Sequence, residues 1–535
     1  MIGRRTLLGW IGAAWIGVML VLSAGAAEAQ MTLRRGNGAD PRTLDPHRAT
    51  AIPDTHVVYD LFEGLVTRDS KGGVIPGVAE RWEVAEEGTV YTFHLRTNAR
   101  WSNGDPVTAD DFVYSLRRAL DRTATGEAAP LLFGIRHADE VMTGTRPPTV
   151  LGVEARDPRT LVIRLKVPAP TLLQRLALPI AMPVHRASQT EFKEQWAEPG
   201  KLVSNGAFVL TDRRPGKYVG LTRNPQFHDA ANVRFDRVLH ITTPNRNSEL
   251  RWFQSGQLDT TAEVPAEQAK ALAAAYPKEF WNKPFIGTYY YVFNLTREPF
   301  ADNPDLRQAL FLAVDRQKLV DEVTQTSDEP AWGLVPPDIP GYTAPALGKE
   351  LSPTQRVETA RKLFKTAGYG PKRPLSFELK FNKSDNHRKV AEAIVAMWRE
   401  VFGGDAISVL LVAEEWAAFT KSRDTRDFQL ARAAWIGDLD DPTSFLDLFA
   451  SVPGIHNHGG YANPRYDLQS YRQTFVADPA ARMKALAEAE KLLLTDLPLL
   501  PLYHYRTRYL VSQKLKGWEW NMRDIHPSRF LSFGP

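Results

Sequence analysis

The stretch Val90-Tyr91-Thr92-Phe93-His94-Leu95-Arg96 alternates apolar and polar side chains from Tyr91 onward. A period of two is typical of a β-strand that buries one face and exposes the other. The same period recurs in the segment 161–167, where Leu, Ile, Leu and Val occupy alternate positions. These two segments predict strands in the first third of the chain.

Later segments have the three-to-four-residue period of amphipathic helices, and they cover residues 305–323, 353–367, 386–402 and 480–495. The second has the clearest ends, because Ser352 can cap it, Gln355 completes a capping box and Gly368 can end it. Residues 327–352 are rich in Pro and Gly and predict a long ordered loop. Asp441-Pro442 predicts a helix start with Asp441 as N-cap. Helices and strands alternate irregularly, so the fold class is α/β.

Length and composition limit the classes of protein that fit. A chain of 535 residues is too long for one core, so two or three lobes are expected. Lys and Arg total 66 against 62 Asp and Glu, and no basic run stands out, which argues against a nucleic-acid binder. There are no cysteines, which excludes disulfides, thiolate metal sites and a cysteine nucleophile.

The first thirty residues have the three parts of a secretory signal. Arg4 and Arg5 are followed by an apolar run to residue 22 and by Ala27-Glu28-Ala29. The pattern predicts cleavage after Ala29 and a mature protein outside the cytoplasm. A retained membrane anchor is the alternative, and the paired arginines leave open export by the twin-arginine route.

The chain carries no complete catalytic pattern. The chain has no His-Glu-x-x-His helix and no Gly-x-Ser-x-Gly elbow. His456 and His458 offer two imidazoles without a nearby carboxylate in the sequence, so a loop is favoured over a metal site. The segment 438–441 is acidic but lacks the spacing of a calcium loop. We therefore expect no catalytic residues, no metal and no cofactor.

Several short motifs occur together, in one order along the mature chain. They include residues 60–65, 91–96, 106–115, 289–294, 299–300, 307–310 and 441–445, together with Leu44-Asp45-Pro46, Pro76-Gly77-Val78-Ala79-Glu80-Arg81-Trp82, Trp101-Ser102-Asn103-Gly104, Ser204-Asn205-Gly206-Ala207-Phe208 and Trp435-Ile436-Gly437-Asp438. As a set they resemble the family-5 extracellular solute-binding proteins, the dipeptide and oligopeptide-binding group.

The resemblance implies a periplasmic binding protein fold of type II. This is a bilobal Venus-flytrap with an extra inserted domain, hence three lobes. Residues 1–29 would be the signal peptide. Lobe I would combine residues 30–62, 186–286 and 505–535, lobe II would be the insertion 63–185, and lobe III would span 287–504. Ligand would lie between lobes I and III, which close about a hinge.

The resemblance also implies the binding residues. Asp438 matches the carboxylate that pairs with a peptide α-ammonium; the alternative is a solvated loop acid or a helix cap. Arg423, Arg432 and His387 match positions that hold the α-carboxylate, and the alternative for the arginines is the surface or a salt bridge to Asp424 or Asp427. Extended stretches Ala434-Trp435-Ile436-Gly437 and Thr50-Ala51-Ile52 would present edges to the peptide backbone. Trp416 and Trp435 would line side-chain pockets, unless Trp416 is core.

The implied function is capture of oligopeptides for an ABC importer, by a monomer that meets permease subunits in the inner membrane. Murein peptides, another amine-bearing solute, a secreted peptidase and a periplasmic chaperone or sensor are the alternatives. Three positions depart from the family. Gly287 and Ile436 stand where relatives have a cysteine pair, Thr50 replaces an acidic residue, and a pocket tyrosine is replaced near Ala128.

Overall fold

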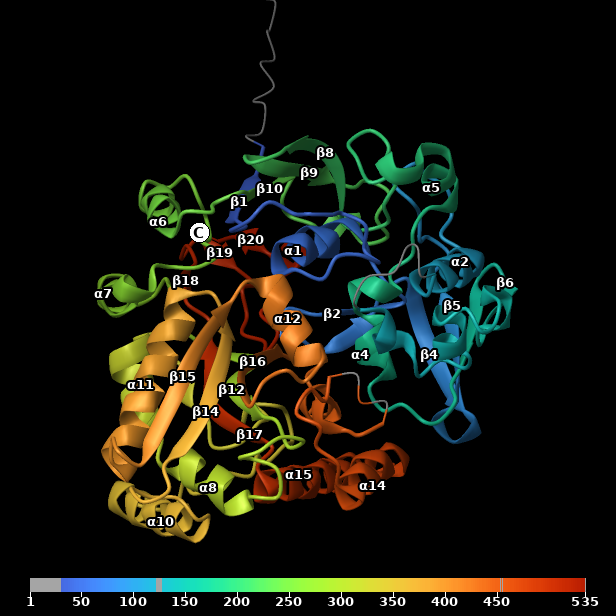
Figure 1. Cartoon of the computed structure of the whole chain (residues 1–535). Coiled ribbons are helices and arrows are strands. Elements are labelled where there is room, and N and C mark those ends of the chain that lie inside the picture. Colours follow the sequence, from blue (N-terminus) through green and yellow to red (C-terminus); the bar gives the residue numbers. More distant parts are fainter. Residues whose placement is uncertain (1–29, 122–127, 453, 455, 535) are drawn as a thin grey trace, which may run out of the picture.

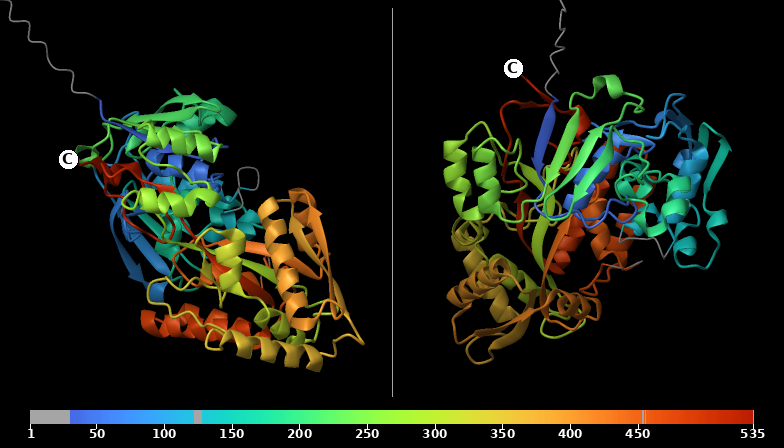
Figure 2. Two further views of the ribbon diagram at one scale, coloured as in Figure 1. Left: turned by 90° about the vertical axis from the view of Figure 1, so that its left-hand side faces the viewer. Right: turned by 90° about the horizontal axis from the view of Figure 1, so that it is seen from above.

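The computed structural model describes residues 30–121, 128–452, 454 and 456–534. The expected signal segment and its cleavage site lie outside these ranges. The three sheets with four or more strands lie apart in Figure 1, with β1, β8, β9 and β10 at the top, β4 to β6 at the right and the largest sheet below. Residue 30 and the C-terminal end lie near each other beside the upper sheet (Figure 2).

The largest sheet has six strands in the order β13-β17-β12-β16-β14-β15. β12 runs antiparallel to β16 and β17, whereas β14 runs parallel to β15 and β16. The bounds are β12 Pro284–Phe293, β13 Glu329–Pro330, β14 Leu375–Asn382, β15 Ile407–Glu414, β16 Leu430–Ile436 and β17 Leu499–Arg506. Two hydrophobic clusters, built mainly from residues 286–503, bury this sheet against helices α8 Pro304–Leu312, α10 Pro353–Thr366, α11 Asp385–Phe402 and α15 Pro479–Asp496.

The upper sheet has four strands in the order β1-β10-β9-β8. Their bounds are β1 Thr32–Gly36, β8 Phe208–Arg214, β9 Tyr218–Arg223 and β10 Arg237–Ile241, with helices α1 Ile52–Leu61, α5 Arg186–Phe192, α6 Arg246–Gln254 and α7 Ala269–Ala275 nearby. One hydrophobic cluster joins residues 33–62, 182–238 and 509–531. Three stretches far apart in sequence therefore share one core.

A third sheet, β4-β5-β7-β6, confirms the two strands expected from the period of two. β5 Val90–Leu95 and β7 Thr160–Arg164 pair directly, and Phe93 and Leu161 face each other in the core. β7 ends before Val167, because Pro168 follows and Leu165 bridges Ile135 instead. The other elements of this region are β2 Val66–Arg68, β3 Val74–Pro76, β4 Ala79–Ala85, α2 Ala109–Ala119, α3 Ala138–Met142, β6 Val153–Asp157 and α4 Leu172–Leu176.

Three of the four expected helices are confirmed as α10, α11 and α15, and Ser352 and Gln355 form the expected capping box. The single helix over 305–323 is wrong. α8 stops at Leu312, Asp315 caps a new turn, and a π-helix spans Leu319–Thr324. In the turn after the break, Arg316 is fully buried and donates from Nε to the Pro501 carbonyl at 2.9 Å.

The expected loop at 327–352 has only one short strand, β13, which pairs with β17. The remaining elements are β11 Phe280–Trp281, α9 Arg316–Lys318, α12 Trp416–Asp424, α13 Thr443–Leu446, α14 Pro464–Arg472, β18 Tyr509–Leu510, β19 Leu515–Lys516 and β20 Ser532–Phe533. Within the ranges that the structure describes, no helix has the length and apolar character needed to cross a membrane.

Candidate binding site

Strand β16 has one open edge. It pairs with β12 along its whole length, but with β14 only at Leu430 and Ala431. From Arg432 to Ile436, no described strand pairs with its other side. The Gly437 N–H donates to the Ile286 carbonyl at 2.8 Å, so odd-numbered residues direct their backbone groups toward β12. Arg432, Ala434 and Ile436 therefore direct their N–H and C=O groups to the open edge.

The second expected edge is shorter than the sequence suggested. Ile52 is the first residue of α1, and Pro53 in the first turn favours that helix start. Ala51 is extended, with φ −82° and ψ 148°, but its carbonyl accepts the N–H of Thr55 at 3.0 Å. The expectation that Ile52 presents an extended edge is thus corrected, and Ala51 offers only part of its backbone.

Three carboxylates follow β16, and two of them have partners. Asp440 accepts from Arg68 Nη1 at 2.5 Å. Asp441 accepts from both Nη atoms of Arg482 at 2.6 and 3.0 Å and from the Thr443 N–H at 3.0 Å. The helix α13 begins at Thr443 with Pro442 as its N-cap, so the expectation that Asp441 is the N-cap is wrong by one residue. Among the described residues, no hydrogen bond or ion pair engages the Asp438 carboxylate. Asp438 alone of the three therefore keeps its charge available to a ligand.

The surroundings of Asp438 are partly buried and polar. Burial raises its pKa, and the positive charges of Arg523, Arg175 and His456 oppose that rise. The Tyr59 hydroxyl, on α1, is buried without a hydrogen-bond partner in the described structure, and burial raises its pKa. A carboxylate with poor hydration and no ion pair favours an incoming cation. No pattern in the sequence indicates Tyr59 or Arg175, because nothing local connects them to Asp438.

Arg432 lies on one face of β16 among aromatic rings. Its guanidinium lies 4.9 Å from the ring centre of Tyr289, which stacks on Tyr503 at 4.7 Å. Tyr289 Oη lies 3.1 Å from His387 Nδ1. Burial, with help from Arg432, lowers the pKa of His387 to about 4. His387 is therefore neutral near pH 7, so it can offer a hydrogen bond but not the positive charge that the sequence led us to expect.

Arg423 is on α12. Burial lowers the pKa of its guanidinium and the charge of Arg432 lowers it further, whereas Tyr290 and Asp424 oppose this shift. Neither Arg423 nor Arg432 forms a salt bridge within the part of the chain that the structure describes. Asp424 lies near His458 at 3.6 Å, and Asp427 pairs with Arg297 and Lys380 at 3.1 and 3.3 Å. Arg423 and Arg432 each keep a buried Nε atom without a hydrogen-bond partner in this part of the structure. Two guanidinium groups without a carboxylate partner suit an anionic ligand group.

The two tryptophans differ in exposure. Trp435 is half-buried against His456, with 5.1 Å between ring centres, and its Nε1 is buried without a described partner. Trp416 begins α12 and is 58% exposed, so it is not a core residue.

Ala128 packs against the hydrophobic cluster of residues 65–181. In the described ranges, no three His, Cys, Asp or Glu side chains gather as a metal site.

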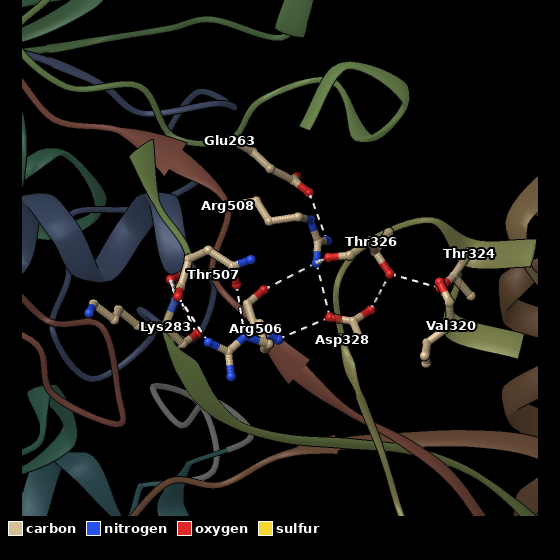
Figure 3. A network of polar contacts seen from close by, with 10 residues as sticks. Glu263, Lys283, Val320, Thr324, Thr326, Asp328, Arg506, Thr507 and Arg508 are labelled. Carbon is tan, nitrogen blue, oxygen red and sulfur yellow. Dashed lines mark hydrogen bonds and ion pairs between the residues drawn. The ribbon is translucent and has the colours of Figure 1, made fainter. Parts of the chain in front are cut away.

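Two chain segments cross side by side where the expected lobes I and III meet. Thr507 N donates to the Lys283 carbonyl at 2.9 Å, and Lys283 N donates to Thr507 Oγ1 at 3.1 Å. Next to this crossing, Arg508 lies between Asp328, at 2.9 Å, and Glu263, at 3.5 Å (Figure 3). Asp328 also accepts the Arg506 N–H at 3.0 Å. The lobe boundaries themselves stay a prediction.

An open strand edge with unpaired charges around it can bind an extended ligand that carries charged groups. The chain belongs to family 5 of the bacterial extracellular solute-binding proteins, whose middle-region model matches residues 73–457.

The chain is 36% identical over 494 residues to the periplasmic oligopeptide-binding protein of Salmonella typhimurium, covering 91% of this chain and 90% of that protein. It is 35% identical over 496 residues to the periplasmic murein peptide-binding protein of Escherichia coli, covering 92% and 91%. The Haemophilus influenzae oligopeptide-binding protein in complex with the peptide RPPGFSPFR superposes with a TM-score of 0.79 at 32% identity, covering 95% of this chain and 99% of that one. The family and fold expected from the sequence are therefore confirmed.

Proposed function

We propose that this protein is a periplasmic receptor that binds short peptides and delivers them to the permease subunits of an ABC importer. It would be exported with cleavage after Ala29 and would act as a monomer without catalytic activity. The observation that carries the proposal is the pairing of an open β16 edge with an unpaired Asp438 carboxylate at its end.

The peptide backbone would add to β16 as a further strand. Arg432, Ala434 and Ile436 direct their backbone groups to that side, and strand addition binds any sequence because every peptide carries the same amides. Side chains of the added peptide would alternate between two faces of the sheet. One face carries Arg432 and Tyr289, and the other carries Trp435 and Tyr290.

The ends of the peptide would set its direction. The α-ammonium would pair with Asp438, and the α-carboxylate would pair with Arg432, with Arg423 close by. His387, being neutral, would donate a hydrogen bond to the same carboxylate. Closure of lobe I (30–62, 186–286 and 505–535) on lobe III (287–504) would exclude water from these pairs and strengthen them.

A second candidate is a cell-wall peptide as cargo. Its support is the 35% identity to the Escherichia coli murein peptide-binding protein, close to the value for the oligopeptide-binding relative. Both cargoes carry a free amine and a carboxylate, so Asp438 and Arg432 suit either. The choice depends on the pockets beside β16, and another amine-bearing solute would need the same anchors.

Native mass spectrometry of the undenatured protein tests the proposal, because bound cargo that survives purification adds its mass. Calorimetric titration then compares tri-alanine, its N-acetyl form, its C-terminal amide and a murein tripeptide. We expect a Kd in the micromolar range or below for a peptide with both ends free, roughly −8 kcal/mol, and weaker binding when either end is blocked. Equal binding of the blocked forms, or shortened peptides after incubation, would contradict the proposal.

A further inference from the structure

The loop that carries Asp438 is attached to a part of the chain far away in sequence. Leu439, the next residue, is 1% exposed and belongs to the hydrophobic cluster of the β4-β5-β7-β6 region. Every other buried member of that cluster in the described structure lies between Leu65 and Ala181. One side chain of the binding loop is thus inserted into the core of the expected lobe II.

Polar contacts fix the following residue to the same region. Asp440 accepts from Arg68 Nη1 at 2.5 Å, and the Arg68 side chain is only 3% exposed. Arg68 Nη1 also donates to the Gly72 carbonyl at 2.8 Å, which holds the guanidinium against β2 and the turn after it. The Asp440 N–H donates to Gln174 Oε1 on α4 at 3.1 Å. Both the backbone and the side chain of Asp440 are therefore bound.

Asp438 lies on the short span between two fixed points. Before it, the Gly437 N–H is bonded to Ile286; after it, Leu439 and Asp440 are held by residues 65–181. The backbone of a residue between such neighbours has little freedom to move, so the direction in which its side chain leaves the chain is set. Arg175, on α4, adds a positive charge close enough to stabilise the ionised carboxylate. The orientation of the acid thus depends on a region outside the proposed peptide cleft.

We propose that Arg68 is a positioning residue for peptide binding, which acts by holding the Asp440 carboxylate so that Asp438 faces the ligand ammonium. Through Arg68, the inserted region of residues 63–185 then affects ligand recognition, although Arg68 itself does not contact the ligand. This inference rests on the proposed role of Asp438 in binding the peptide amine.

Titration of Arg68→Met with a free tripeptide and with its N-acetyl form tests this role. We expect a loss of tenfold or more in affinity for the free peptide and less than twofold for the acetylated one. Arg68→Lys should recover part of the loss, because it keeps the charge but not the planar geometry. Arg81→Met is the matched control, since Arg81 belongs to an exposed ion pair with Glu83 on β4 of the same region and should bind as wild type.

Two additions keep the test decisive. Arg68→Met leaves the Asp440 charge unpaired and can fail to fold for that reason. In that case the double variant Arg68→Met with Asp440→Leu removes both charges. We expect this double variant to fold and still to bind the free peptide more weakly than wild type. In an Asp438→Asn background, Arg68→Met should cause no further loss. Equal losses for free and acetylated peptides, or wild-type affinity in the folded double variant, would overturn the inference. If wild-type protein binds no peptide, the proposed function fails instead.

Discussion

Gly287 on β12 and Ile436 on β16 lie directly opposite each other in the antiparallel pair. Because Gly437 bonds to Ile286, this is a non-hydrogen-bonded pair, whose Cα atoms are about 4.5 Å apart. The family resemblance implies that these are the positions of a cysteine pair in some relatives. A Cβ atom on Gly287 would lie 2.6 Å from Tyr505 Cδ2, so the absence of a side chain makes room for the Tyr505 ring.

The variant Gly287→Cys with Ile436→Cys should form a disulfide under mild oxidation, provided that the Tyr505 ring shifts. The Cα separation suits a disulfide, and closing so long a loop stabilises a protein by about 2–4 kcal/mol in ordinary cases. The crowding of Tyr505 should reduce this gain. Thiol titration and melting with and without reductant measure it.

Ile436→Cys alone is the control, with one reactive thiol and no gain. A double variant that keeps two free thiols after oxidation would contradict the predicted geometry. If the Tyr505 ring is the obstacle, adding Tyr505→Ala to the double cysteine variant should allow the disulfide to form.

Asp438→Asn should weaken binding of peptides that have a free amine. Removing one partner of a buried ion pair costs about 3–5 kcal/mol, which corresponds to a loss of roughly two to four orders of magnitude in affinity. Calorimetry with the tightest tripeptide measures the loss, and exposed Asp338→Asn is the control. Unchanged affinity would remove the role of Asp438.

Asp328→Asn should destabilise the crossing between the expected lobes. The Asp328 side chain is 3% exposed and that of Arg508 is 11% exposed, so the substitution leaves a buried guanidinium poorly paired. We expect a loss of about 3–5 kcal/mol in the free energy of unfolding. Glu263→Gln, at the exposed end of the same network (Figure 3), should cost about 1 kcal/mol or less. Equal effects in urea unfolding would contradict this ranking.

His504 should make stability depend on pH. Its Nδ1 lies 2.9 Å from Thr288 Oγ1, which donates to the Leu334 carbonyl and so accepts from the imidazole. Burial lowers the pKa of His504 to about 3. The unfolded chain therefore binds this proton first, and the contribution is complete above the unfolded pKa of about 6.5 and is lost as pH falls below it.

Substitution His504→Asn keeps the donor and removes the titration. Because wild type alone loses stability on acidification at this site, the cost of the substitution should shrink by about 2 kcal/mol between pH 7.5 and pH 5.0. The difference in stability between wild type and His504→Asn also cancels the pH dependence that both proteins share. Glu490 is an example, because its pKa is raised to about 7 and its effect on stability has the opposite sign. A pH-independent difference in urea unfolding would contradict the prediction.

Local features of the sequence determined much of the fold. The alternation around Phe93 specifies a strand, and the Ser352 and Gln355 pair specifies a helix start, because each depends on neighbours a few residues away. The interrupted helix after Leu312 could not be foreseen. The turn that follows the break makes a hydrogen bond from Arg316 to Pro501, 185 residues further along the chain, which no local pattern signals.

The site divides in the same way. The sequence supplied three acids after Trp435, and the family resemblance singled out Asp438. Only the tertiary structure decided which acids are neutralised, since Asp440 meets Arg68 across 372 residues and Asp441 meets Arg482 across 41. It also made His387 neutral by burying it. Pairing and desolvation depend on which distant segments pack together, and no local pattern encodes that choice.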